Sequence, residues 1–245
     1  MPQVRQPELV EATLEAVGTD RLARVEALAD LAGLRALEGD VEAGRRVAQE
    51  LREVIDDLGL AALIAGPSEF LAEVERVAGE PARLVGPLTD AVQRLERAGL
   101  RAFLELQRAM LAWAQTEAGR LDDAAETLAV LQAQQAAEPS GDPFPDAWAA
   151  WARAAIAAAD GRAVDAAGLA EGAIAYLDDS DFSSLRAEAR IRAASYALAA
   201  DRSEHARRRA AEGLRIAEEK GYRRGADLAR SILADVATRR AASAS

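Results

Sequence analysis

Turn-forming residues recur along this chain at nearly constant spacing, and this spacing constrains the fold more than any other feature. Small or polar turn residues stand at 38–40, 78–80, 118–120, 160–162 and 200–202, at intervals of 40, 40, 42 and 40 residues. A second series lies about midway between them, at Gly18, Gly59, Gly99, Gly141, 178–180 and Gly221. Glycine is favoured just past a helix end, where the backbone turns into the left-handed region. Two interleaved series therefore predict helix pairs that repeat about every 40 residues.

The segments between the turns have helical periodicity. Apolar residues recur three or four positions apart, as at Leu22, Val25 and Leu28, which is the pattern of one helix face. Gly66 and Pro67 interrupt the fourth segment, so that helix either bends there or begins only near Ser68. The sequence predicts twelve helices, at 7–17, 20–38, 41–58, 61–78, 81–98, 100–118, 121–137, 145–160, 162–178, 183–200, 203–219 and 223–239.

The amino-acid composition also favours an all-α fold. Half of the residues are apolar, but only 4% are aromatic, and alanine occupies roughly a quarter of all positions. Alanine has the highest helix propensity of any residue. A β-sandwich or barrel would need more Val, Ile, Thr and aromatic residues to cover its sheets.

The residues after each turn of the first series follow a pattern of size. Positions five, nine and twelve after the turn residue are small or apolar in all five repeats. They are Gly44, Ala48 and Leu51; Leu84, Leu88 and Ala91; Ala124, Leu128 and Leu131; Ala166, Ala170 and Ala173; and Ala206, Ala210 and Gly213. This pattern resembles tetratricopeptide repeats, whose paired helices cross closely at these positions. The resemblance implies a right-handed superhelix (α-solenoid) of antiparallel helix pairs with a period of ~40 residues.

We expect a single repeat domain over residues 1–245, because the periodicity continues on both sides of the loop at 137–145. A hinge at 137–145 is the alternative.

A narrower resemblance covers the C-terminal part of the chain. Residues 180–189, Ala206, 219–221 and 228–234 look like the C-terminal repeats of actinobacterial signalling proteins that carry an adenylate or guanylate cyclase or an ATPase module upstream. The chain matches neither the metal-binding aspartates of cyclases nor a phosphate-binding loop. The resemblance therefore implies a bacterial signalling or transcription-control system, and it brings no catalytic activity with it. Whether the chain is a fragment of such a protein stays open.

Charge and residue types exclude several function classes. The absence of cysteine removes disulfides, thiolate catalysis and cysteine-bound metals, and the one histidine, His205, has no second ligand or nucleophile beside it. The net charge of −11 disfavours nucleic acid and anionic membranes as partners. With no membrane-spanning run and no secretory signal, we expect a cytoplasmic protein without cofactor or metal.

The repeat resemblance also implies a concave groove that binds a partner. The family's groove positions select Glu69, Glu73, Arg76, Trp113, Glu117, Trp148, Trp151, Glu188 and Ser195. All three tryptophans of the chain fall in this set, and two interpretations of them stay open. They either line the groove as binding residues or fill core spaces that the alanines leave. If they are exposed among the glutamates, charge complementarity predicts a peptide or protein partner with basic residues.

Two function hypotheses follow. The first is a non-catalytic scaffold or sensor that binds a peptide or protein. The alternative is a small-molecule receptor or enzyme, with a pocket lined by Trp148, Trp151, Tyr176 and Tyr196 inside the superhelix. Self-association into a homodimer through exposed terminal helices is compatible with either hypothesis.

Overall fold

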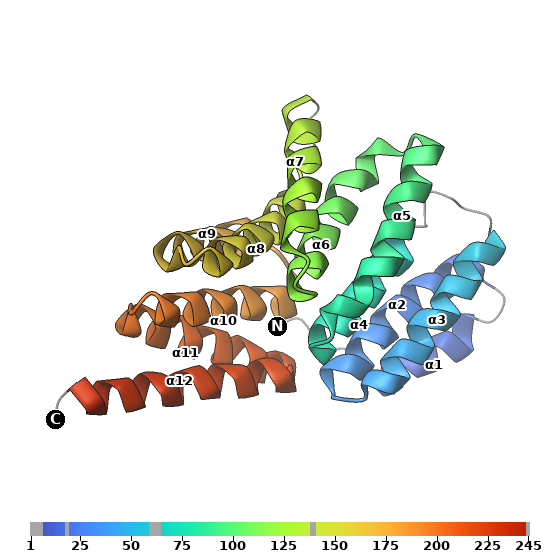
Figure 1. Ribbon diagram of the computed structural model, residues 1–245. Coiled ribbons are helices and arrows are strands. Elements are labelled where there is room, and N and C mark those ends of the chain that lie inside the picture. Colours follow the sequence, from blue (N-terminus) through green and yellow to red (C-terminus); the bar gives the residue numbers. More distant parts are fainter. Residues whose placement is uncertain (1–6, 18–19, 59–64, 138–140, 244–245) are drawn as a thin grey trace.

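The computed structural model describes residues 7–17, 20–58, 65–137 and 141–243, and every regular element within these ranges is helical. Figure 1 shows the helices as successive pairs. They are α1 (Pro7–Val17), α2 (Arg21–Leu37), α3 (Val41–Leu58), α4 (Ala65–Ala78), α5 (Val85–Ala98), α6 (Leu104–Glu117), α7 (Leu121–Ala137), α8 (Pro143–Ala159), α9 (Ala163–Leu177), α10 (Ser183–Ala199), α11 (Ser203–Lys220) and α12 (Arg223–Ser243). Short 3-10 turns, Pro81–Leu84 and Arg101–Phe103, precede α5 and α6.

The prediction of twelve helices is confirmed, and the differences lie at their ends. Helix α8 begins two residues earlier than predicted, because the Asp142 side chain accepts a hydrogen bond from the Phe144 backbone N–H and caps the helix. Pro81 begins a 3-10 turn instead of the α-helix itself. Helix α4 begins at Ala65, and the predicted start at 61 lies outside the described residues.

The five turns of the first series share one backbone conformation. Each has one residue in the left-handed region, with φ between 57° and 95°. Four are glycines and the fifth is Asp201, the one described non-glycine residue with positive φ. These residues are Gly39, Gly79, Gly119, Gly161 and Asp201. The 40-residue spacing in the sequence is therefore a spacing of equivalent turns in the structure.

Small residues lie where neighbouring helices come close. Six alanines at the predicted close-approach positions have no exposed surface: Ala124, Ala166, Ala170, Ala173, Ala206 and Ala210. Helices that follow one another pack side by side, as α2 does with α3, α8 with α9, and α10 with α11. A hydrophobic core that extends from Ala72 in α4 to Ala193 in α10 continues past the loop between α7 and α8.

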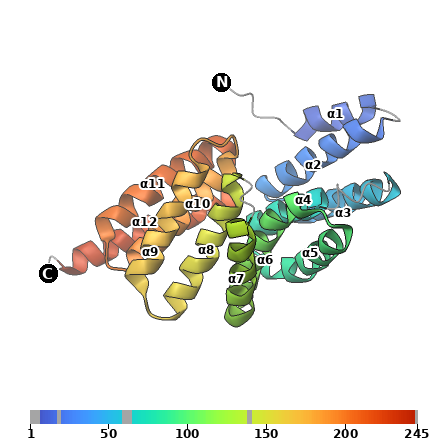
Figure 2. The same cartoon turned by 90° about the horizontal axis from the view of Figure 1, so that it is seen from above.

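The two ends of the helical array contact each other. A second hydrophobic core joins residues of α2 and α4, such as Ala36 and Val77, to residues of α10, α11 and α12, such as Ile216 and Ala226, and to Tyr222 just before α12. Figure 1 shows one end of α4 beside the ends of α10 and α12, and Figure 2 shows the same helices from above. The elements in contact are more than a hundred residues apart in sequence, and the 40-residue repeat alone does not predict this closure.

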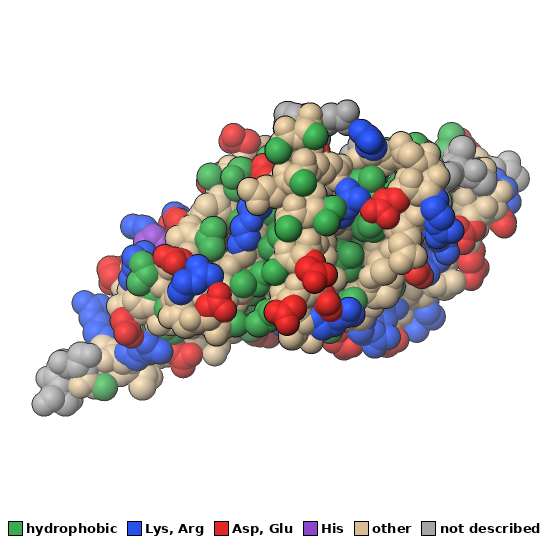
Figure 3. Space-filling view, turned by 45° about the horizontal axis from the view of Figure 1, so that its top comes forward, with side chains coloured by type: hydrophobic (Ala, Val, Ile, Leu, Met, Phe, Trp, Pro, Cys, Tyr) green, Lys and Arg blue, Asp and Glu red, His purple; other side chains and the backbone are tan. Residues whose placement is uncertain are grey.

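Exposed apolar side chains lie mainly in the middle of the chain. Figure 3 shows hydrophobic side chains along the centre of one face, with charged groups among and around them. The large exposed apolar residues are Leu22, Phe103, Val130, Val164, Tyr176 and Phe182. No helix in the described ranges has the length and apolarity that crossing a membrane requires.

Two helix-interior glycines test the close packing of the pairs. A Cβ at Gly44 in α3 would lie 2.9 Å from the Ala32 carbonyl oxygen, whereas a Cβ at Gly168 in α9 would meet no neighbouring residue within 4 Å. Gly44→Ala should lower the free energy of unfolding by about 1–3 kcal/mol through overpacking. Gly168→Ala should raise it by up to ~1 kcal/mol through helix propensity. Urea unfolding measures both, and equal stability of the two variants would contradict the close approach.

Candidate functional site

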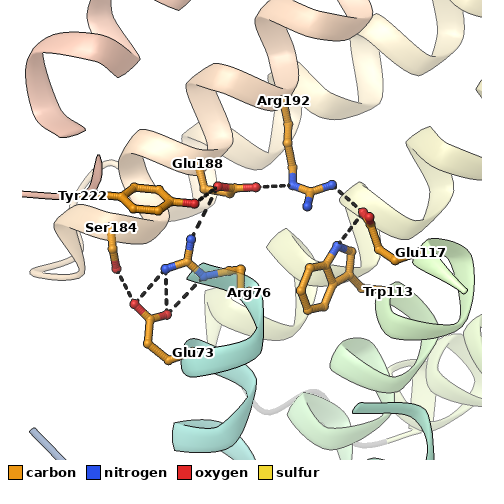
Figure 4. A network of polar contacts seen from close by, with 8 residues as sticks. All are labelled: Glu73, Arg76, Trp113, Glu117, Ser184, Glu188, Arg192 and Tyr222. Atoms are coloured by element: carbon orange, nitrogen blue, oxygen red, sulfur yellow. Dashed lines mark hydrogen bonds and ion pairs between the residues drawn. The ribbon is translucent and has the colours of Figure 1, made fainter. Parts of the chain in front are cut away.

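Several predicted groove residues meet in one buried polar network. Glu73 and Arg76 lie three residues apart on one face of α4. Trp113 and Glu117 come from the last turn of α6, and Glu188 comes from α10. Figure 4 shows their side chains pointing toward one another, together with Ser184, Arg192 and Tyr222. We call these eight residues the central network.

Arg76 forms one half of the central network, between α4 and α10. Its side chain has no exposed surface, and its Nη2 atom lies 2.7 Å from both carboxylate oxygens of Glu73. Its Nη1 atom lies 3.5 Å from a Glu188 oxygen. Ser184 Oγ donates to Glu73 at 2.8 Å, and Tyr222 OH donates to Glu188 at 2.7 Å. Charges and hydrogen bonds thus connect α4, α10 and the residue just before α12.

Arg192 forms the other half, between α6 and α10. Its Nε donates to Glu188 at 2.8 Å and its Nη1 donates to Glu117 at 2.6 Å. The guanidinium also lies over the rings of Trp113 and Trp151, 5.5 Å and 5.3 Å from their centroids, within the range of a cation–π contact. Two carboxylates and two indole rings therefore surround one guanidinium.

The charges of the central network shift its pKa values. Burial alone would raise the pKa of Glu188, but the charges of Arg192 and Arg76 and the Tyr222 hydrogen bond outweigh it, so this pKa lies below its ordinary value. Burial, followed by the negative charge of Glu188, raises the pKa of Tyr222. Glu188 is therefore ionised and Tyr222 is a neutral donor at neutral pH.

The tryptophans are core residues. Trp113, Trp148 and Trp151 are 0%, 5% and 1% exposed. Of the two interpretations that the sequence left open, the structure supports core packing and contradicts exposure in a groove. Trp113 and Trp148 pack with ring centroids 4.7 Å apart. The physical reason is volume, because the alanines that surround them leave spaces that only large rings fill.

One predicted groove residue, Ser195, is not part of this network. Ser195 is exposed on α10, and the side chain of Glu69 lies outside the described residues. Sequence reasoning missed Arg192, Ser184 and Tyr222. Arg192 follows Glu188 by four residues, a spacing that pairs charges on a helix, and could have been found. Tyr222 follows a turn glycine and carried no such signal.

The basic groups expected from a partner are present within the chain itself. The sequence predicts that exposed groove glutamates would attract basic residues of a partner. In the structure Glu73, Glu117 and Glu188 pair with Arg76 and Arg192 of the same chain. In the described part of the chain, no group of three or more His, Asp or Glu residues could hold a metal ion. The arrangement can bind guanidinium groups.

Neither a model of a known protein family nor a curated protein sequence matches this chain. Among solved structures, the crystal structure of BtubC (BKLC) from P. vanneervenii is similar, with a TM-score of 0.56 and 16% sequence identity. The match covers 87% of this chain and 89% of that chain. At this identity the similarity concerns the fold alone.

Glu188→Gln tests the electrostatics of the central network. This change should lower the free energy of unfolding at pH 7 by about 3–5 kcal/mol, because it leaves two buried arginines short of a charge partner. Since the folded-state pKa of Glu188 lies below its unfolded value of about 4.3, its contribution is present above that pH and is lost as pH falls through the folded-state pKa. Urea unfolding between pH 3 and pH 7 should show the difference from wild type shrinking in acid.

Glu219→Gln is the matched control, because Glu219 and its partner Arg215 are both more than 60% exposed. It should change stability by less than ~1 kcal/mol. Equal losses for the two variants, or a difference from wild type that does not vary with pH, would contradict the charge assignment.

Tryptophan fluorescence tests the burial of the three rings. Emission should lie near the limit for fully buried indoles, and iodide should not quench it, because all three rings are at most 5% exposed. Quenching by iodide in the folded protein would show that the rings are accessible. Unfolding in urea provides the control, since iodide should quench all three rings there.

Proposed function

We propose that this chain is a non-catalytic helical-repeat scaffold or sensor that binds a peptide or protein partner through arginine side chains of that partner. We also propose that its helix pairs follow a right-handed superhelix, and that it works in the cytoplasm as part of a bacterial signalling or transcription-control system. Five equivalent turns and the small residues at the crossings support a repeat architecture.

The way Arg192 is held is the observation that carries this proposal. Its guanidinium is paired with Glu117 and Glu188 and lies over two indole rings. Carboxylates that accept from a guanidinium, together with aromatic faces beneath it, are the groups that recognise arginine in partners. The chain thus occupies an arginine-binding site with an arginine of its own.

A partner arginine can reach this site because the site is partly open. The side chains of Arg192 and Glu117 are 18% and 29% exposed, whereas Arg76 and Glu188 are 0% and 3% exposed. The Arg192 side chain can swing away from α6 while α10 stays packed. An incoming guanidinium then takes its place between Glu117 and the rings of Trp113 and Trp151. Arg76 stays in place and maintains the closure of the array.

No observation favours the alternative of a receptor or enzyme with an internal pocket. Trp148 and Trp151 are buried against each other, with ring centroids 4.9 Å apart. Two surface pockets are present elsewhere, and neither is lined by Trp148, Trp151, Tyr176 or Tyr196.

Arg192→Ala tests the proposed arginine site by vacating it. We expect this variant to bind a short blocked peptide that contains one arginine with a Kd below ~1 mM. Wild type should bind the same peptide at least about tenfold more weakly, because its own arginine competes from a tethered position. Isothermal titration calorimetry measures both affinities.

Two controls separate recognition of arginine from general attraction to an acidic protein. The same peptide with citrulline, which keeps the shape and lacks the charge, should not bind Arg192→Ala. The double variant Arg192→Ala, Glu117→Gln should lose most of the affinity for the arginine peptide. If Arg192→Ala binds no arginine peptide, or binds arginine and citrulline equally, the proposal is wrong.

A further inference from the structure

A surface pocket lies where the two ends of the helical array meet, next to Tyr222 of the central network. It has a volume of about 430 Å³, which falls in the usual range for small-molecule sites. Its walls come from the turn after α2, from the last turn of α4 and from the first turns of α12. The lining residues include Ala36, Leu37, Val41, Val77, Ala78 and Leu228, which form an apolar surface.

Two arginines also line this pocket, and the charge of one of them, Arg224, acts on Glu188 of the central network. Arg223 and Arg224 begin α12, and within the described residues neither forms an ion pair or a side-chain hydrogen bond. The pocket's one carboxylate, Asp227, is already paired with Arg230 at 2.8 Å. The pocket therefore has two positive charges beside an apolar surface and no free negative charge.

The turns of the 40-residue repeat hold these arginines in place. A Cβ at Gly79 would overlap the guanidinium of Arg224, and a Cβ at Gly39 would lie 3.8 Å from Nη1 of Arg223. The two turns are also the C-terminal ends of α4 and α2, which carry partial negative charge. The partial negative charge of these helix ends stabilises the two arginines electrostatically. No hydrogen bond to the arginine N–H groups is needed for this, so these donors stay available to a ligand.

We propose that this pocket binds a carboxylate attached to an aliphatic group. The two guanidiniums supply charge-assisted hydrogen bonds to the carboxylate oxygens. The surface formed by Leu37, Val77 and Leu228 covers the aliphatic part and removes it from water. A free aliphatic acid and the carboxyl end of a polypeptide that ends in leucine share this chemistry. Either ligand would contact both ends of the array and stabilise its closed arrangement.

Titration with hexanoate, and with a hexapeptide that ends in leucine, tests this site and separates the two sources. At least one of these acids should bind with a Kd below ~1 mM, measured by chemical-shift changes of backbone amides that line the pocket. The peptide with an amidated C-terminus and hexanamide should each bind at least about tenfold more weakly than the corresponding acid. Binding of hexanoate alone identifies a small-molecule site, and binding of the peptide alone identifies a chain end.

Variants link the binding to these side chains. Arg223→Gln and Arg224→Gln should each weaken binding at least about tenfold, whereas Arg215→Gln, an exposed arginine of α11 outside the pocket, should have no effect. Ser231→Trp fills the pocket from an exposed position, and it should abolish binding. Ala237→Trp, also exposed on α12 and outside the pocket, is its control.

Two results would overturn the proposal. One is that neither acid binds wild type. The other is binding that persists at full strength in Arg223→Gln and Arg224→Gln, or that the amides reproduce. In either case the arginines serve only to complement the helix ends of α2 and α4.

Discussion

A guanidinium with no exposed surface holds the two ends of this helical array together. Arg76 projects from α4 between Glu73 on its own helix and Glu188 on α10, and its guanidinium lies over the ring of Tyr222 at 5.5 Å. A buried charge costs several kcal/mol unless it is paired. Helix α10 must therefore present Glu188 at this place, and the residues before α12 must present Tyr222. The closure of the array follows from this requirement, together with the hydrophobic core that surrounds it.

The rest of the structure brings these charges together through small residues. Alanines without exposed surface, such as Ala166 and Ala210, let the paired helices approach closely. This close packing of the helix pairs brings α6 and α10 near each other. Arg192 of α10 can therefore donate to Glu117 of α6. The three tryptophans fill the spaces that alanines cannot, and two of them, Trp113 and Trp151, also provide the ring faces under Arg192. One set of side chains thus serves both packing and the candidate site.

The sequence predicts the local structure well and the closure poorly. Turn glycines and Asp201 are local signals, because a left-handed backbone is needed wherever two helices join tightly. Together with the helical periodicity of the segments between turns, they located the twelve helices. Five of the predicted residues, Glu73, Arg76, Trp113, Glu117 and Glu188, do converge. The side chains that lie between these residues are placed by contacts between distant parts of the chain, such as the contact of Ser184 with Glu73, 111 residues apart. No periodicity encodes such a pair. The pairs of Arg76 with Glu73 and of Arg192 with Glu188 each lie on one helix and are local. The long-range pairs of Arg76 with Glu188 and of Arg192 with Glu117, and the burial of the tryptophans, required the three-dimensional structure.

The closure itself is best tested by a distance measured in solution. The chain has no cysteine, so spin labels can be placed at Asp56→Cys and Ala211→Cys without background labelling. Both positions are exposed, and they lie on α3 and α11, on opposite sides of the central network. Double electron–electron resonance should give one narrow distribution centred on the distance in the structure, and Arg76→Ala should broaden and lengthen it. A broad or longer distribution in the otherwise unchanged chain would contradict closure, and so would a distribution that Arg76→Ala leaves unchanged.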